Sequence, residues 1–173
     1  QSGSNKILKL MNRKHTREFY FEIIDKLRKH KSDIALSSDF IVGFPEEDDR
    51  DFQETMDLIH HVGFMNSYSF KYSPRPGTPA ADREQIPLKI QDDRLKIMQT
   101  TLDQQQIDFN KKFLSKRLEV LISSSGKYKG QVKGKSEFNQ SVAIPGNPNI
   151  IGDIVPVQIT DISVHSLIGK AEV

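Results

Sequence analysis

The chain of 173 residues contains no cysteine. It can therefore form neither a disulfide nor a cysteine-ligated metal site, and it has no thiol nucleophile. No apolar run approaches the roughly 18 residues of a membrane-spanning helix, and the N-terminus lacks a signal-peptide pattern. These absences fit a cytoplasmic protein, and we expect no membrane partner.

Charge of one sign is also lacking, because 25 basic and 23 acidic residues leave a formal net charge of +2. Overall charge therefore identifies no partner. The chain is long enough to bury a core but too short for a complete eightfold β/α barrel, which needs about 250 residues. It does not begin with Met, and we expect it to be a fragment or a processed piece.

The rest of the chain is organised around residues 37–48, SSDFIVGFPEED. An apolar β-branched run, a turn at Gly43 and Pro45 and an acidic helix start are typical of a buried parallel strand that leads into its crossover helix. Asp48 is expected to cap this helix, with Asp51 in a role close to a capping box. Ligands of parallel α/β folds bind at the carboxyl ends of strands, which predicts a site around residues 43–47, although a turn without a ligand gives the same pattern.

Flanking patterns predict the remaining elements of an α/β first domain, residues 1–108. Helical spacing of apolar residues, Phe19, Ile23 and Leu27 among them, follows a cap at Thr16. We expect helices at 5–11, 17–30, 49–62 and 87–113, and strands at 34–42 and 67–72. These elements are part of a parallel sheet or of an incomplete barrel.

A second domain, residues 109–173, is predicted to be all-β. Short strand-like runs punctuated by glycine favour a small antiparallel barrel of OB-like size. The expected strands are 118–122, 128–132, 140–144, 154–162 and 166–173.

Few residues suggest chemistry. The histidines have no companions at metal-ligand spacing, and no Ser/His/Asp set stands out, so we predict no catalytic residue and no metal site in this chain. We attribute the acidic residues after Gly43 to the helix dipole rather than to a divalent ion.

Arg75 lies in a proline-rich loop at the end of a predicted strand, where it can bind carboxylate or phosphate or be a plain surface residue. The predicted barrel carries a basic cluster with Tyr128 and Phe138 among or beside it, which suits single-stranded nucleic acid but equally suits a solvated surface. Its lysines that we assign to substrate binding are Lys127, Lys129, Lys133 and Lys135.

Three stretches resemble the MiaB-type tRNA methylthiotransferases, which are radical S-adenosylmethionine (SAM) enzymes. They are residues 1–13 (QSGSNKILKLMNR), 37–45 (SSDFIVGFP) and 72–81 (YSPRPGTPAA). The tail, with 139–142 (NQSV) and 152–161 (GDIVPVQITD), is similar to a TRAM domain, an RNA-binding barrel. Sister enzymes that modify a ribosomal protein usually lack the Arg75-Pro76 pair, so this loop favours tRNA.

The resemblance implies a fold and a cofactor. The first domain would be the C-terminal part of a radical SAM partial β/α barrel, and the SAM pocket would include Gln1, Ser2, Asp39, Ile41 and Gly43. Arg75 would contact substrate or the cofactor carboxylate. Two 4Fe-4S clusters would serve the full-length enzyme, with all their ligands upstream of this cysteine-free chain.

The implied activity is that of a tRNA-2-methylthio-N6-isopentenyladenosine synthase, which modifies the adenosine beside the anticodon. Its partners would be the tRNA anticodon stem-loop and the missing N-terminal half of the same enzyme. We expect this piece alone to be inactive, and its exposed strand edges permit self-association. The alternatives are an RNA-binding module without activity and a ribosomal-protein methylthiotransferase.

One position departs from the family pattern. The family continues Phe-Pro-Gly-Glu-Thr, whereas this chain has Glu46 in place of the glycine and Asp48 in place of the threonine. Asp48 can still cap the helix, but Glu46 lacks the backbone freedom of glycine and adds a charge near the expected cofactor.

Overall fold

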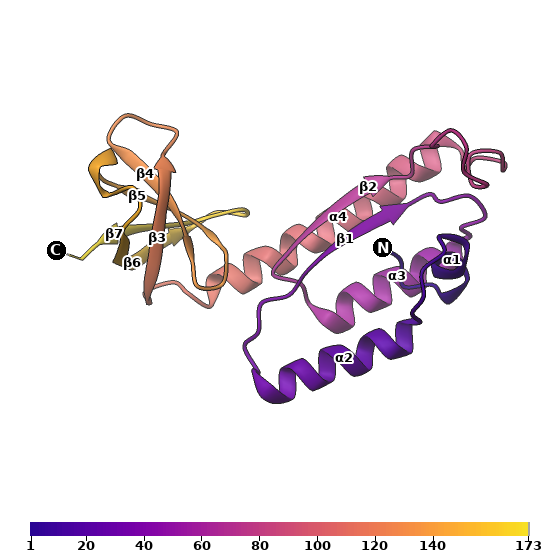
Figure 1. The fold of residues 1–173 in the computed structure, drawn as a ribbon, viewed down its shortest axis with the longest axis horizontal. Helices are drawn as coiled ribbons and strands as arrows, with labels where there is room; N and C mark the ends of the chain where they lie inside the picture. Colours follow the sequence, from indigo (N-terminus) through magenta and orange to yellow (C-terminus); the bar gives the residue numbers. More distant parts are fainter. Residues whose placement is uncertain (173) are drawn as a thin grey trace. The chain divides into compact units, whose positions relative to one another are not determined.

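The computed structural model describes residues 1–172 and divides into two compact units (Figure 1). The first unit is Gln1–Leu102, and the second begins at Asp103. This division falls within helix α4 (Leu88–Lys111), the same helix in which the sequence places the domain boundary after residue 108. No helix among residues 1–172 is both long and apolar enough to cross a membrane.

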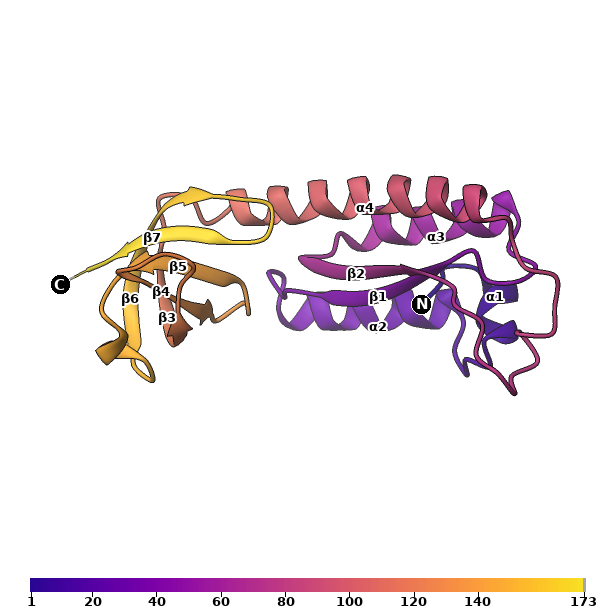
Figure 2. The ribbon, with the colours of Figure 1, turned by 90° about the horizontal axis from the view of Figure 1, so that it is seen from above.

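The first unit is an α/β fold built on two parallel strands that lie side by side (Figures 1 and 2). Its elements in order are α1 (Asn5–Leu10), α2 (Arg17–His30), β1 (Ser37–Val42), α3 (Asp49–Val62), β2 (Asn66–Lys71) and the first part of α4. The predicted elements are confirmed, except that β1 begins three residues later than the pattern 34–42 suggests. A two-stranded sheet closes no barrel, so the partial barrel stays a prediction.

One face of this sheet is covered by helices. Phe40 and Val42 point to the same side of β1, because strand residues alternate, and both are buried. They join an apolar cluster that takes in α2, α3 and α4 through Ile24, Met56, Leu58, Ile59, Val62, Met98 and Leu102. The other face of the sheet is left without a helical layer in the described residues.

Helix termini follow the predicted capping chemistry. Thr16 accepts a hydrogen bond from the Phe19 amide at the start of α2. Asp48 and Asp51 form a complete capping box at the start of α3, as predicted. Gly63 ends α3 in the left-handed conformation, at φ 62°.

The apolar stripe of α2 is only partly covered. Ile24 is 3% exposed, whereas Phe19, Ile23 and Leu27 are 51%, 38% and 39% exposed. The helical spacing therefore predicted the helix correctly. However, fewer of its apolar residues are buried than the pattern suggests.

The second unit contains a closed five-stranded barrel with strand order β3-β4-β5-β7-β6. Its elements are β3 (Arg117–Ser125), β4 (Gln131–Ser136), β5 (Ser141–Pro145), the 3-10 helix η1 (Pro148–Ile150), β6 (Ile154–Ile162) and β7 (Leu167–Ala171). The small barrel is confirmed. It is not wholly antiparallel, because β5 and β7 pair in parallel to close it.

The predicted strand 128–132 is wrong in position. Residues 126–130 form the turn between β3 and β4, closed by hydrogen bonds from the Gly126 amide to the Gln131 carbonyl and from the Gln131 amide to the Tyr128 carbonyl. Gly130 has φ 77° and completes the turn. The strand therefore begins at Gln131. Of the predicted strand 166–173, residue 173 lies outside the described residues.

A buried polar network fastens the end of α4 to the barrel. Asn110, 1% exposed, donates to the carbonyls of Ser163 (3.2 Å) and Val164 (3.1 Å). The Gln140 side-chain amide donates to the side-chain oxygen of Asn110 (Oδ1) at 2.7 Å. Ser136 Oγ lies 3.1 Å from Gln140 Oε1. Each buried amide is thus paired, which avoids the cost of an unsatisfied polar group.

Candidate functional site

The uncovered face of the two-stranded sheet presents apolar side chains. Ile41 pairs with Phe70 across the strands, and Asp39 pairs with Tyr68. Phe70 and Tyr68 are 55% and 62% exposed, which is unusual for aromatic residues inside strands. The face is therefore available to a ligand or to further protein.

A groove of ≈ 820 Å³ lies where β1 and β2 end. This volume is within the usual range of ligand pockets, about 300–1,000 Å³. Its lining is mainly apolar and aromatic, with several basic and amide side chains and, among the described residues, no carboxylate. The lining residues include Met11, Ile41, Phe44, Phe70 and Tyr72, and the polar residues Gln1, Asn12, Arg13, Lys71 and Arg75.

Three of the residues proposed from the sequence meet in this groove: Gln1, Ile41 and Arg75. They come from the N-terminal segment, from β1 and from the loop after β2, so the fold brings together positions up to 74 residues apart. Arg13 also lines the groove, although the sequence assigned it no role. Its only sequence signal was its place at the end of the 1–13 stretch.

The N-terminal segment is held beside β1. The Ile41 amide donates to the Gln1 carbonyl at 3.0 Å. Gly3 packs so closely on α3 that a Cβ atom there would lie 2.3 Å from the Glu54 carbonyl oxygen. Only glycine permits this approach, and the approach fixes Gln1 at the edge of the groove.

Buried hydroxyl groups fasten the same segment to α3. Ser2 Oγ lies 3.1 Å from Thr55 Oγ1, and Ser4 Oγ donates to Asp51 at 2.6 Å. Lys6 Nζ donates to the other Asp51 oxygen at 2.7 Å, and this hydrogen bond raises the pKa of Lys6. Ser2 is therefore engaged in the protein interior and does not line the large groove.

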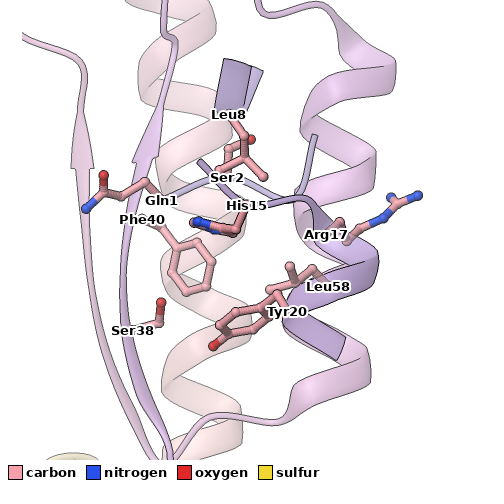
Figure 3. A pocket seen from close by; sticks show the side chains of 9 residues that line it. All are labelled: Gln1, Ser2, Leu8, His15, Arg17, Tyr20, Ser38, Phe40 and Leu58. Carbon is pink, nitrogen blue, oxygen red and sulfur yellow. The ribbon is translucent and has the colours of Figure 1, made fainter. Parts of the chain in front are cut away.

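Ser2 lines instead the small cavity drawn in Figure 3. His15, Tyr20 and Ser38 approach it from other elements, while the Gln1 side chain points away from them (Figure 3). Burial raises the pKa of Tyr20. The volume of ≈ 20 Å³ has room for about one water molecule, so this cavity holds no cofactor.

Asp39 and Gly43 lie outside both cavities. Asp39 is exposed on the uncovered face of β1. Gly43 has φ 70°, and a Cβ atom there would lie 2.4 Å from the Gln91 Cγ atom of α4. Its amide donates to Glu47 Oε1 at 2.9 Å. Gly43 is therefore required by the packing and by the hydrogen bonding of the turn.

The sequence missed a buried ion pair at this turn. Glu47 is 4% exposed and its carboxylate lies 2.8 Å from the Arg94 guanidinium, which also reaches Asp49 at 2.8 Å. Burial raises the pKa of Glu47, opposed by the Gly43 amide and by Arg94. Glu47 is thus not one of the solvated helix-start acids expected from the sequence. Nothing local signals this, because the partners are 47 residues apart.

The loop after β2 presents Arg75 to solvent. The Thr78 amide and hydroxyl both donate to the Arg75 carbonyl, at 3.2 Å and 2.8 Å. Tyr72 packs edge-on against Phe44, with ring centroids 4.8 Å apart. The loop is therefore ordered by its own hydrogen bonds, and the exposed Arg75 side chain lines the groove.

Two buried oxygen atoms of groove residues have no hydrogen-bond partner among residues 1–172. They are Oε1 of Gln1 and the hydroxyl oxygen of Tyr72. Buried polar groups are normally paired, since an unpaired one costs about 1–3 kcal/mol. Groups of this kind are typical of a site that gains partners with a ligand.

The four predicted substrate lysines are all exposed on the β3–β4 hairpin. Lys133 and Lys135 alternate with the buried Val132 and Gly134 on β4, so they point out of the barrel. Lys127 and Lys129 line a hollow of ≈ 750 Å³ with Tyr128.

Phe138 does not belong to the basic surface. It packs on the barrel core against Phe109 and Phe113, with ring centroids 6.1 Å and 4.9 Å away. The aromatic platform among the lysines is therefore Tyr128 alone in this part of the described chain.

The described part of the chain shows no cluster of potential metal ligands. No group of three or more His, Asp or Glu side chains there is arranged to hold a metal ion, and the sequence has no cysteine. The absence of a metal site in this chain stays a prediction.

The α/β unit with a groove at its strand ends, followed by a small closed barrel, defines a class of protein. Residues 1–59 match the family model of the radical SAM superfamily, and residues 111–171 match that of the TRAM domain. The chain therefore carries part of a radical SAM domain followed by a TRAM domain.

Relatives narrow the class further. Over 98% of its length the chain is 53% identical to tRNA-2-methylthio-N(6)-dimethylallyladenosine synthase of Rickettsia rickettsii (strain Sheila Smith). It is 52% identical to the protein of the same name in Rickettsia bellii (strain OSU 85-389). These findings confirm the resemblance to the MiaB-type methylthiotransferases. The chain spans 39% of the length of these relatives.

Proposed function

We propose that this chain is the C-terminal portion of a tRNA-2-methylthio-N6-isopentenyladenosine synthase, which methylthiolates the adenosine beside the anticodon. The observation that carries the proposal is the 53% identity over 98% of the chain, together with a groove that unites Gln1, Ile41 and Arg75. In this assignment residues 1–108 belong to the radical SAM part and residues 109–173 to the TRAM domain.

The groove suits SAM. Its apolar side chains, such as Ile41 and Phe70, match an adenine ring, and a guanidinium such as that of Arg75 matches a carboxylate. The unpartnered Oε1 of Gln1 would accept a hydrogen bond from a ribose hydroxyl. We assign to Ser2 and Gly43 the role of holding the backbone around this groove in position. Asp39 lies on the uncovered face of β1, beside the groove. When bound, SAM supplies the radical precursor and the methyl group.

The residues present do not fit an iron–sulfur cluster, because such clusters need cysteine thiolates and the sequence contains none. We assign both 4Fe-4S clusters of the enzyme, and their ligands, to the remaining N-terminal part of the full-length protein. This chain alone is accordingly inactive, and it contributes binding and orientation rather than the reactive metal.

The barrel contributes the RNA-binding surface. Lys127, Lys129, Lys133 and Lys135 lie on one hairpin, where they can neutralise phosphates of the tRNA anticodon stem-loop. Such an enzyme works in the cytoplasm, where its tRNA substrate is found.

The test is mass spectrometry of tRNA nucleosides from a strain that lacks the full-length gene. We expect the 2-methylthio form of isopentenyladenosine to disappear and to return when the intact gene is restored. Unchanged levels would overturn the tRNA assignment. A simultaneous loss of methylthiolation on a ribosomal protein would instead identify the sister activity.

A further inference from the structure

We propose that the hollow beside Tyr128 is a subsite for one unpaired nucleotide of RNA, which stacks its base on the Tyr128 ring. The inference rests on the proposed RNA-binding role of the barrel and goes beyond it. It names a place, a residue and a single-stranded ligand, whereas the exposed lysines alone require only a polyanion.

The hollow is a shallow, open depression whose two walls are joined by a backbone hydrogen bond. It is formed where the turn 126–130 meets the segment 146–148, and it has a volume of ≈ 750 Å³. The Gly146 amide donates to the Gly130 carbonyl at 2.9 Å, which joins the two walls. The Lys127 amide donates to the Gln131 side chain at 3.0 Å, which fixes the turn itself.

Tyr128 is held at this hollow without being buried by it. Its side chain is 66% exposed, although burial of an aromatic ring against the barrel would remove apolar surface from water. The Lys127 ammonium lies 5.7 Å from the ring centroid, within the distance of a cation–π contact. An exposed aromatic ring beside cationic side chains is the platform on which unstacked bases bind.

The positive charge of the lysines at the hollow favours a ligand that carries phosphate groups. Lys127 and Lys129 flank Tyr128 in the chain, and no carboxylate lines the hollow among the described residues. A base on Tyr128 would therefore carry its flanking phosphates toward two ammonium groups. A duplex cannot offer its base faces in this way, so the site favours single-stranded or looped RNA over paired RNA.

The experiment uses the whole 173-residue chain and two labelled probes, a single-stranded RNA of about ten nucleotides and a blunt duplex of equal length. We expect Tyr128→Ala to weaken single-strand binding about 5- to 150-fold, with duplex binding and the salt slope unchanged. Tyr128→Phe should retain binding, because the ring is kept. Ile154→Ala, another exposed apolar truncation on the barrel at 65% exposure, is the matched control and should not change binding.

A second set of variants separates this inference from the proposed function. Lys127→Gln and Lys129→Gln should each reduce the salt slope for single strands by about 0.7, whereas Lys170→Gln on β7 should not. If these lysine variants weaken binding but Tyr128→Ala does not, the stacking subsite is refuted and RNA binding stands. If the unaltered chain binds neither probe at low salt, both proposals fail. Equal melting temperatures exclude unfolding as the cause of any loss.

Discussion

Arg94 and Glu47 form an ion pair of 2.8 Å in which the two side chains are only 8% and 2% exposed. The pair joins α4 to the turn that follows β1, one residue beyond Glu46. A second hydrogen bond, from Arg94 to the Glu47 carbonyl at 3.1 Å, fixes the backbone of the turn as well. The carboxyl end of β1 is thus shaped by a helix that lies far along the sequence.

Replacing Arg94 by alanine should lower the free energy of unfolding by about 3–5 kcal/mol, because Glu47 would remain buried without its partner. Urea denaturation measures the change. Lys96→Ala, an exposed truncation on the same helix, is the control and should change the free energy by no more than about 0.5 kcal/mol. An equal effect of the two substitutions would show that the pair does not stabilise the turn.

The raised pKa of Glu47 predicts a pH dependence. Burial raises this pKa above its ordinary value of 4.5. Between pH 4.5 and the folded-state pKa, the folded chain therefore retains a proton on Glu47 that the unfolded chain releases. The component of the folding free energy that is linked to protonation of Glu47 is therefore fully present below pH 4.5 and is lost as the pH rises through the folded-state pKa. Glu47→Gln should remove this component from a series of urea titrations at increasing pH. Parallel curves for the two proteins would contradict the assignment.

Glu46 occupies a backbone conformation that favours glycine, at φ 71°. Glu46→Gly should raise the free energy of unfolding by about 1 kcal/mol, because glycine adopts this left-handed conformation without strain. The greater conformational entropy of glycine in the unfolded chain offsets only part of this gain. Its contact with Arg83, at 3.3 Å, is half exposed and contributes little. Glu46→Ala removes the same contact but keeps the strain, so thermal melting should show no gain for this control.

Asn110 connects α4 to two turns of the barrel. Asn110→Ala should destabilise the second unit by about 2–3 kcal/mol, because it leaves the Gln140 amide and two carbonyls without their partner. Circular dichroism during denaturation reports the loss. Gln104→Ala removes an exposed side-chain hydrogen bond from the same helix and should alter stability by less than about 0.5 kcal/mol.

Arg75 is expected to bind a carboxylate or phosphate in the groove. In the reconstituted full-length enzyme, Arg75→Ala should weaken binding of SAM or of tRNA about 10- to 150-fold, the usual effect of losing a charged hydrogen bond. Titration calorimetry with each ligand separately identifies which one is affected. Arg50→Ala is the control, since Arg50 is exposed on α3 and lines no part of the groove. Unchanged affinity for both ligands would exclude the contact.

Local signals predicted the elements around the groove. The β-branched run, Gly43 and the Asp48–Asp51 capping box act over a few residues, and each is found where the sequence placed it, with a shift at the start of β1. Glu46 is a sharper case, because the family pattern has glycine there and the structure supplies the reason, a positive φ.

Long-range contacts could not be predicted in the same way. Whether Glu47 is solvated or buried depends on Arg94, and whether Phe138 faces RNA or the core depends on Phe109 and Phe113. The short strand-like run 128–132 also favoured a strand from Tyr128, where a tight turn forms instead and the strand begins at Gln131. For Glu47 and Phe138 the deciding partner comes from another element, whereas the turn is closed by local hydrogen bonds among residues 126–131.

Closure of the barrel has a consequence for how copies of this chain would behave at high concentration. Every barrel strand has two neighbours, so that unit offers no free backbone edge on which another chain could seed a growing sheet. In the first unit β2 has β1 as its strand partner among residues 1–172, and its far edge is unpaired. The far edge of β1 has no strand partner there either, although the Ile41 amide is bonded to the Gln1 carbonyl. Any aggregation of the isolated chain should therefore nucleate on this two-stranded sheet rather than on the barrel, and a charge or proline placed on the edge of β2 should reduce it.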